Sequence, residues 1–199
     1  MGTLTPNSLR MLMATLTVTL LVFYLFCVAA YRRTPPAHSS LDDAVERGVN
    51  VSNGVCTFFD PGLSINDLCD AMATRGQLVQ SKGCRHNDCF AQHRDRPCYR
   101  QLHLGRSSKS LGKTFAEQVA CLPPGYEISS ARVVLTAMVL HRLAKRQKSP
   151  PDYYFRTIDW TSDGHRVSVG YFGRDLLLVQ NQYDDARSGY VGLAFSRKL

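Results

Sequence analysis

The fold of this chain is decided by the stretch SSARVVLTAMVLHRLAKRQ, residues 129–147. It predicts a helix, because Ser129 or Ser130 suits the N-cap and Lys145 and Arg146 lie near the carboxyl end, where the helix dipole favours cations. A pair of prolines shortly afterwards stops the helix. Apolar side chains occupy nearly every side of its first turns. We therefore expect a helix that is buried all round and forms the centre of the core.

After the prolines, the spacing of apolar residues changes to an alternating pattern. Segments rich in aromatic and β-branched residues lie at 154–160, 166–172, 176–182 and 190–196, and turn-forming residues separate them. Short strands joined by tight turns predict an antiparallel meander. In the second segment, Val167, Val169 and Tyr171 alternate onto one face, which we expect to cover the helix. The predicted fold class is α+β.

The residues before the central helix contain less regular structure. A second helix is expected over residues 65–74, because Ser64 and Asp67 have the spacing of a capping box. Residues 32–55 are polar and are expected to form a stalk, with a short helix over 41–47. The stalk would lead to one cysteine-rich α+β domain over residues 56–199.

Six of the seven cysteines lie between residues 56 and 121, which predicts a domain braced by disulfides in an oxidising compartment. Each bridge would contribute about 2–4 kcal/mol, mainly by restricting the unfolded chain. The sequence leaves the pairing open, because six cysteines allow many arrangements. The candidates are Cys56, Cys69, Cys84, Cys89, Cys98 and Cys121.

Ahead of the domain, residues 11–31 carry no charged side chain, and a helix of this length would span about 31 Å, the thickness of a bilayer core. We expect a single transmembrane anchor over 11–31, preceded by a short tail over 1–10. A cleaved signal peptide is the alternative, because Val28-Ala29-Ala30 offers a processing site. Arg32 and Arg33 favour a cytoplasmic domain, whereas the cysteines favour an oxidising space. We prefer the oxidising side, and the conflict between the two signals stays open.

The net charge of +8 is concentrated in residues 100–150, where nine Lys or Arg stand against two Glu. Such a segment favours contact with anionic lipid, glycan or an acidic protein face, or it is a solvated surface. Nucleic acid is not an expected partner, because no nucleic-acid-binding motif accompanies the charge. Asn50 begins the sequon Asn50-Val51-Ser52 and is a candidate glycosylation site.

Residues 84–103 combine two kinds of zinc ligand: Cys84, His86, Cys89, His93, Cys98 and His103. Their spacing differs from the Cys-x2-Cys pairs of common structural zinc sites. Disulfides beside solvated histidines are the preferred interpretation, and zinc is the alternative if the domain faces a reducing compartment. The sequence has no nucleophile elbow, metalloprotease helix motif or phosphate-binding glycine loop. We therefore expect no catalytic residue, no metal and no cofactor.

Several features of this chain occur together in one known family. They are the uncharged amino-terminal segment, the pair Arg32-Arg33, the short stalk, the run Cys56-Thr57-Phe58-Phe59-Asp60, the Cys84-x4-Cys89 spacing, and the strand motifs Asp159-Trp160 and Gly170-Tyr171-Phe172. Over nearly its whole length the chain resembles the baculovirus per os infectivity factors. Within them it is most similar to the 19-kilodalton envelope proteins of occlusion-derived virus, the fourth of these factors.

The resemblance implies a single-pass protein of the virion envelope. Its partners would be other viral envelope proteins in the complex that lets ingested virions enter midgut cells, together with the membrane and the host-cell surface. Arg32 and Arg33 would then sort the chain through nuclear or endoplasmic reticulum membranes, a viral sulfhydryl oxidase would form the bridges, and Asn50 would stay unmodified. The alternatives are an anchored or secreted enzyme or zinc-binding domain that uses residues 84–103, and a receptor or ligand domain outside any virus.

Overall fold

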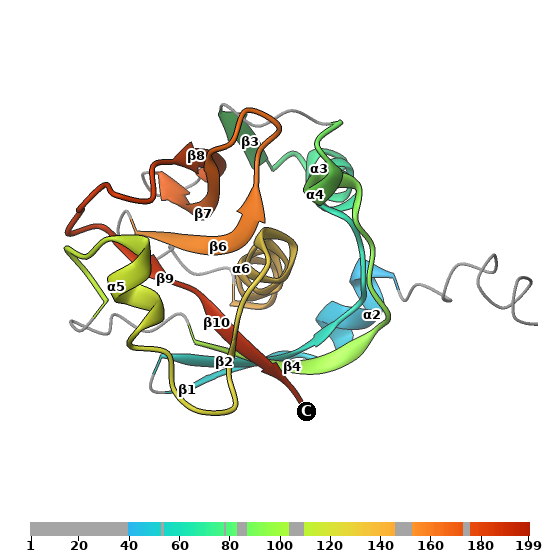
Figure 1. Ribbon diagram of the computed structural model, residues 1–199. Coiled ribbons are helices and arrows are strands. Elements are labelled where there is room, and N and C mark those ends of the chain that lie inside the picture. Colours follow the sequence, from blue (N-terminus) through green and yellow to red (C-terminus); the bar gives the residue numbers. More distant parts are fainter. Residues whose placement is uncertain are drawn as a thin grey trace, which may run out of the picture. The chain divides into compact units, whose positions relative to one another are not determined.

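The central element is helix α6 (Ala131–Lys145), as expected from the sequence. The computed structural model of this chain describes residues 40–52, 54–77, 79–82, 87–103, 110–145, 153–172 and 176–199. Figure 1 shows α6 between two β-sheets. Every residue from Ala131 to Leu140 is buried. The prediction of a helix buried on all sides is confirmed.

The first sheet has the strand order β1-β2-β4-β10-β5, and all its pairs are antiparallel. Its strands are β1 (Val49–Ser52), β2 (Val55–Asp60), β4 (Cys98–His103), β10 (Phe195–Lys198) and β5 (Glu127–Ile128). In the register of β4, Leu102 faces Cys56 on one side and Ser196 on the other, while Arg100 faces Lys198. Because paired residues share a face, Leu102, Cys56, Ser196 and Arg100 all point towards α6.

The second sheet has the order β3-β8-β7-β6-β9. Its strands are β3 (Val79–Lys82), β8 (Leu176–Gln182), β7 (Arg166–Phe172), β6 (Tyr154–Trp160) and β9 (Val191–Leu193). Strands β6, β7 and β8 form the expected antiparallel meander. Val167 and Val169 are fully buried in the core, as predicted, whereas the side chain of Tyr171 lies outside the described part.

The expectation of one fourth strand over residues 190–196 is wrong. The segment divides at Ala194, so that β9 pairs parallel with β6 and β10 joins the first sheet. The backbone of Ala194 donates to the carbonyl of Arg156 and accepts the N–H of Ser129. Alternation identifies a strand, but it does not say which neighbour that strand will pair with.

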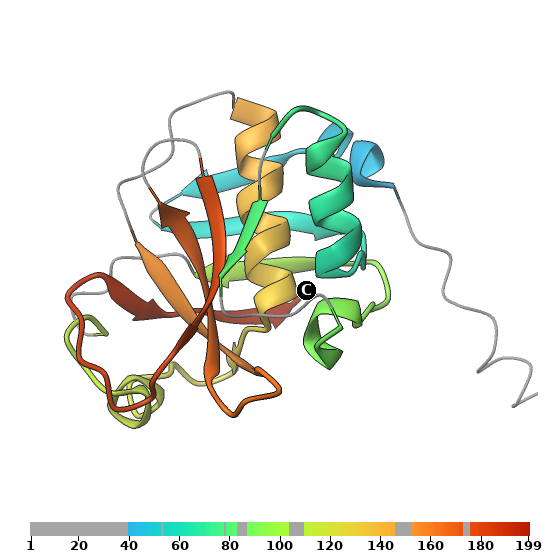
Figure 2. The ribbon, with the colours of Figure 1, turned by 90° about the horizontal axis from the view of Figure 1, so that it is seen from above.

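Some of the shorter helices complete the core on one side of α6. Helix α3 (Ile65–Ala73) begins with the predicted capping box, in which Ser64 and Asp67 bond each other's backbone N–H. Figure 2 shows α3 beside α6. Helix α4 (Cys89–Gln92) contacts both α3 and α6, whereas helix α5 (Phe115–Val119) lies near β9.

The folded domain begins earlier than expected, so the predicted stalk does not extend over all of residues 32–55. Helix α2 (Leu41–Glu46) buries Leu41 and Ala44 in the core, and β1 is the edge strand of the first sheet. Residues 40–55, apart from Asn53, are therefore part of the folded domain. Their polar composition reflects a helix and an edge strand that each bury only one side.

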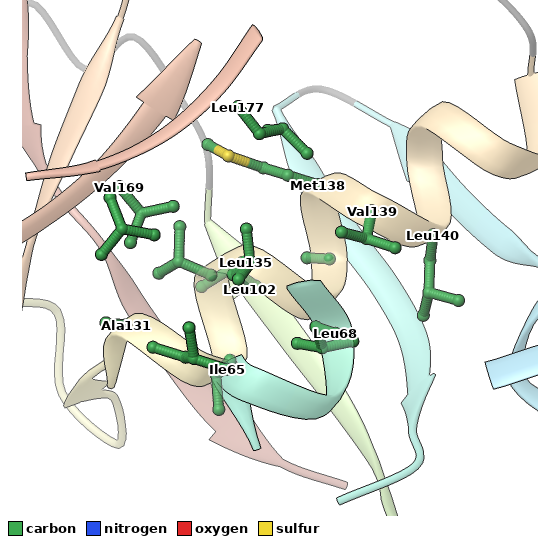
Figure 3. Close-up of a cluster of buried hydrophobic side chains, with 14 of the residues drawn as sticks. Ile65, Leu68, Leu102, Ala131, Leu135, Met138, Val139, Leu140, Val169 and Leu177 are labelled. Carbon is green, nitrogen blue, oxygen red and sulfur yellow. The ribbon is translucent and has the colours of Figure 1, made fainter. Parts of the chain in front are cut away.

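The core joins α6 to α3 and to both sheets. In Figure 3, Ile65 and Leu68 of α3 and Leu102 of β4 surround Leu135, while Leu177 of the second sheet lies beside Met138. No helix in the described ranges is long and apolar enough to cross a bilayer. The predicted tail over 1–10 and anchor over 11–31 lie outside those ranges.

Candidate functional site

A buried carboxylate, Asp60, joins the amino-terminal end of α6 to the first sheet. Asp60 ends β2 and is fully buried. It accepts hydrogen bonds from Arg100 Nε of β4 at 2.7 Å and from both terminal nitrogens of Arg132 of α6 at 2.8 Å. Burial raises the pKa of Asp60, but the hydrogen bond and charge of Arg132, the N–H of Gly62 and the charge of Arg100 outweigh it, so the pKa lies below its ordinary value.

A second carboxylate, Asp95, extends this cluster towards the surface. Asp95 Oδ2 lies 2.5 Å from Arg100 Nη2 and 3.4 Å from Arg132 Nη2. Its loop is fixed by Gly62, whose carbonyl accepts the N–H of Asp95 at 3.0 Å. Gly62 has φ +78°, and a Cβ at this position would lie 2.1 Å from the carbonyl oxygen of Asp95. Only glycine allows this close approach.

A pocket of about 600 Å³ lies next to this cluster, at the amino-terminal end of α6. Its charged lining is mixed, with carboxylates from Asp95, Glu127 and Asp159 and cations from Arg100, Arg132 and Lys198. Apolar side chains of Leu122, Ile128, Val133 and Ile158 line it as well, together with His93, Ser130 and Ser196. The pocket thus combines an apolar wall with several charges.

Asp159 is the carboxylate that faces the helix end. Its Oδ2 accepts the backbone N–H of Ala131 at 2.5 Å, which places a negative charge at the positive end of the helix dipole. Ser130 Oγ adds a longer contact of 3.4 Å to the N–H of Val133, so the predicted serine cap is assisted by a residue of β6. Burial nevertheless raises the pKa of Asp159 above its ordinary value. Among the described residues Asp159 makes no ion pair.

Four ring-bearing side chains gather around Arg166 near the end of β6 that carries Asp159. We call this group the aromatic face: Phe115, Trp160, His165 and Tyr183, with Arg166 at its base. Register explains its centre, because Trp160 and Arg166 are directly opposed in β6 and β7. The Arg166 guanidinium carbon lies 4.1 Å from the Trp160 ring centroid and 3.4 Å from that of Phe115. His165 contacts the ring of Tyr183 edge-on at 4.8 Å.

Arg166 itself is rigidly bound. It donates to both carboxylate oxygens of Asp184, at 2.6 and 2.9 Å, and to the carbonyls of Thr157 and Ile158. It is 4% exposed, whereas Trp160 is 50% and Tyr183 is 66% exposed. The aromatic face therefore presents two large exposed rings on a fixed base.

The cysteine candidates lie on separate elements. Cys56 is in β2, Cys69 in α3, Cys89 in α4, Cys98 at the start of β4, and Cys121 after α5. No disulfide joins any two of these described cysteines, and Cys84 lies outside the described residues. Burial, and then the charge of Asp70, raises the pKa of the Cys69 thiol to about 11. Bracing by disulfides stays a prediction.

The histidines of residues 84–103 do not converge on the cysteines. His103 ends β4, where it stacks on Phe195 and its Nε2 lies 3.2 Å from the hydroxyl of Tyr126. Cys98 begins the same strand, about 16 Å away along an extended chain. His93 lines the pocket, and His86 lies outside the described ranges. Within those ranges, no three or more His, Cys, Asp or Glu side chains are grouped so that they could bind a metal ion.

The remaining predicted sites are peripheral. Asn50 is exposed on the edge strand β1, opposite Thr57, so its side chain is accessible to modification. Arg32 and Arg33 lie outside the described residues. Sequence reasoning did not identify the Asp60 cluster or the pocket. One signal was available, because Arg132 is the only charged residue in the buried part of α6.

Comparison with known proteins adds no relative to this picture. No protein-family model matches the chain, and neither does any curated protein or solved structure. The inference of function therefore rests on the residues of the chain and on their arrangement.

Proposed function

We propose that this chain is a membrane-anchored viral envelope protein and a non-catalytic subunit of the complex through which ingested virions enter host cells. The aromatic face is the observation that carries the docking role. Trp160 and Tyr183 are exposed, and their neighbours fix them in place. Aromatic side chains of this kind dominate the binding energy of protein interfaces. Rings that are already ordered also lose less entropy when a partner binds.

The anchor and the disulfides are further parts of this proposal. The uncharged segment 11–31 supports a single transmembrane helix, which would keep the domain near other envelope proteins. The clustering of cysteines supports bridges formed in an oxidising space. The resemblance to per os infectivity factors supports the envelope location and the partners.

Co-purification tests the docking role directly. Tagged full-length chain is extracted from virions with a gentle nonionic detergent, and the envelope proteins that elute with it are quantified by mass spectrometry. We expect recovery with other envelope proteins, and a decrease of about tenfold on Tyr183→Ala or Trp160→Ala. The matched control is Tyr99→Ala, since Tyr99 is 46% exposed but lies on β4, in the other sheet.

The outcomes separate docking from folding. Trp160 stacks on Arg166, so its removal could also weaken the fold, whereas Tyr183 is largely exposed and contacts only the edge of His165 among the aromatic rings of the described region. A chain that elutes alone under gentle extraction, or a Tyr183→Ala variant that retains all partners, would contradict the proposal.

Two measurements test its finer parts. Protease protection of intact membranes determines the side on which the domain lies. The mass of the protein, measured under non-reducing and reducing conditions, gives the number of disulfide bridges. Six free thiols among the candidate cysteines would contradict the prediction that disulfides brace the domain. One equivalent of bound zinc would instead support the zinc-binding alternative.

A further inference from the structure

The pocket at the end of α6 contains carboxylates that the protein neutralises only in part. Asp159 is half-buried and makes no ion pair within the described residues, and the charges of His93, Arg132 and Arg166 offset only part of its burial, so that its pKa stays above the ordinary value. Glu127 is 64% exposed, and its Oε1 approaches Arg100 Nη1 only to 3.8 Å. A half-buried carboxylate whose charge is only partly offset is costly, and a bound cation in direct contact would lower that cost.

The arginines of the pocket are already committed. Arg132 directs both terminal nitrogens to Asp60 and shares Asp95 with Arg100, and both arginines are at most 3% exposed. Lys198 is 59% exposed and lies 4.0 Å from Asp95. Asp60 and Asp95 thus offset the two buried cations, which leaves Glu127 and Asp159 as the pocket carboxylates with the weakest pairing.

A buried hydroxyl provides an independent sign of a ligand. Ser196 is 1% exposed, lines the pocket, and has no hydrogen-bond partner for its Oγ among the described residues. Buried hydroxyls normally have a partner, so this one is available to a bound group. Next to it, Leu122, Ile128 and Ile158 form an apolar wall.

We propose that this pocket binds the cationic end of a lysine or arginine side chain from a partner polypeptide. Asp159 and Glu127 bind the ammonium or guanidinium group, and Ser196 Oγ accepts one of its N–H groups. The methylene stem packs on Ile128 and Ile158, as long basic side chains do on apolar surfaces. This proposal concerns the pocket alone and depends neither on the aromatic face nor on the membrane anchor.

Small probes test the pocket without any knowledge of the partner. Full-length chain in nonionic detergent micelles is titrated with Nα-acetyl-lysine amide and Nα-acetyl-arginine amide, and binding is followed by saturation-transfer difference NMR. We expect dissociation constants on the order of 1 mM for probes of this size. The neutral norleucine analogue and the acidic glutamate analogue are expected to show no binding. The two cationic probes distinguish an ammonium from a guanidinium ligand.

Variants assign the binding to this pocket. Glu127→Gln and Asp159→Asn are each expected to raise the dissociation constants of the cationic probes by about tenfold or more. The first changes an exposed side chain, and the second retains an oxygen that can accept the N–H of Ala131. The control Glu46→Gln makes the same change at the exposed end of α2 and should have no effect. Unchanged binding in both pocket variants, equal binding of norleucine, or preference for glutamate would overturn the proposal.

Discussion

Replacement of Asp60 by asparagine tests the ionic cluster that connects α6 to the first sheet. Asp60→Asn keeps the size and shape of the side chain but removes its charge. Two arginines, each at most 3% exposed, would then share a neutral amide in place of a carboxylate. The amide nitrogen would also face donors where an acceptor is needed, because Asp60 accepts from Gly62, Arg100 and Arg132.

The expected cost follows from burial. Removal of one partner from a buried ion pair costs about 3–5 kcal/mol, because the other charge stays buried without compensation. A domain of this size has a free energy of unfolding of about 5–15 kcal/mol, so the variant would lose a large part of it. Asp95 lies at 2.5 Å from Arg100 and would compensate in part, which favours the lower end of the range.

The measurement is urea unfolding of the full-length chain in micelles, followed by far-UV circular dichroism. The matched control is Asp42→Asn, which breaks the contact of 2.5 Å between Asp42 and Arg75. Asp42 is 75% exposed, so its loss should cost no more than about 1 kcal/mol. If the two variants differ in stability by less than about 1 kcal/mol, burial is not what makes the Asp60 cluster important.

The same variant should change the response to acid. The pKa of Asp60 in the folded protein lies below its ordinary value of 3.8, because Arg132, Gly62 and Arg100 together outweigh burial. A carboxyl with a lowered pKa contributes stability that is fully present above the unfolded value and is lost as the pH falls through the folded value. The native chain should therefore lose stability below about pH 4, and Asp60→Asn should lose less of it over that range. Parallel acid profiles for the two proteins would refute the assignment.

Three further outcomes are expected. Gly62→Ala should lower the free energy of unfolding by more than about 2 kcal/mol in urea unfolding, whereas Gly48→Ala, at the same φ of +78° but with nothing within 4 Å of the added Cβ, should cost about 1 kcal/mol. Under reducing conditions at pH 8, mass spectrometry should show that iodoacetamide modifies exposed Cys89 well before Cys69, whose pKa is about 11 because of burial and Asp70. Gln118→Leu should lower the thermal midpoint, because the buried amide donates to two backbone carbonyls and accepts from Arg156, and its loss costs about 2–3 kcal/mol.

Local patterns predicted the parts of the fold that depend on local physics. Strands β6, β7 and β8 begin and end at the predicted residues, and α6 and α3 lie where their caps and periodicity placed them. The first sheet could not be predicted, because β10 inserts between β4 and β5 from a distant part of the sequence. Residues 190–196 show the limit most clearly, since one alternating segment supplies strands to both sheets.

Local sequence patterns likewise predicted only part of the candidate site. Trp160 lies in a segment that the sequence predicts as a strand, but only the structure shows that its side chain is 50% exposed and so accessible to a partner. Asp60 had the sequence context of a turn, Asp60-Pro61-Gly62, and nothing nearby indicated its role. Its partners Arg100 and Arg132 lie 40 and 72 residues away in the sequence. A buried charge requires an opposite charge, but sequence alone cannot say which one.

Arg132 belongs both to the ionic cluster that stabilises the fold and to the lining of the pocket. The rest of the buried part of α6 carries no charge, so Arg132 at the amino-terminal end is the one charged residue that this helix buries between Ala131 and Leu140. The arginine that pairs with Asp60 also lines the pocket, and Asp95 belongs to both groups. Asp60→Asn should therefore disturb the fold and the pocket together, whereas Glu127→Gln should change ligand binding alone. A pocket whose floor consists of the ion pairs of the core keeps its shape without a ligand, and this order favours recognition of a single side chain.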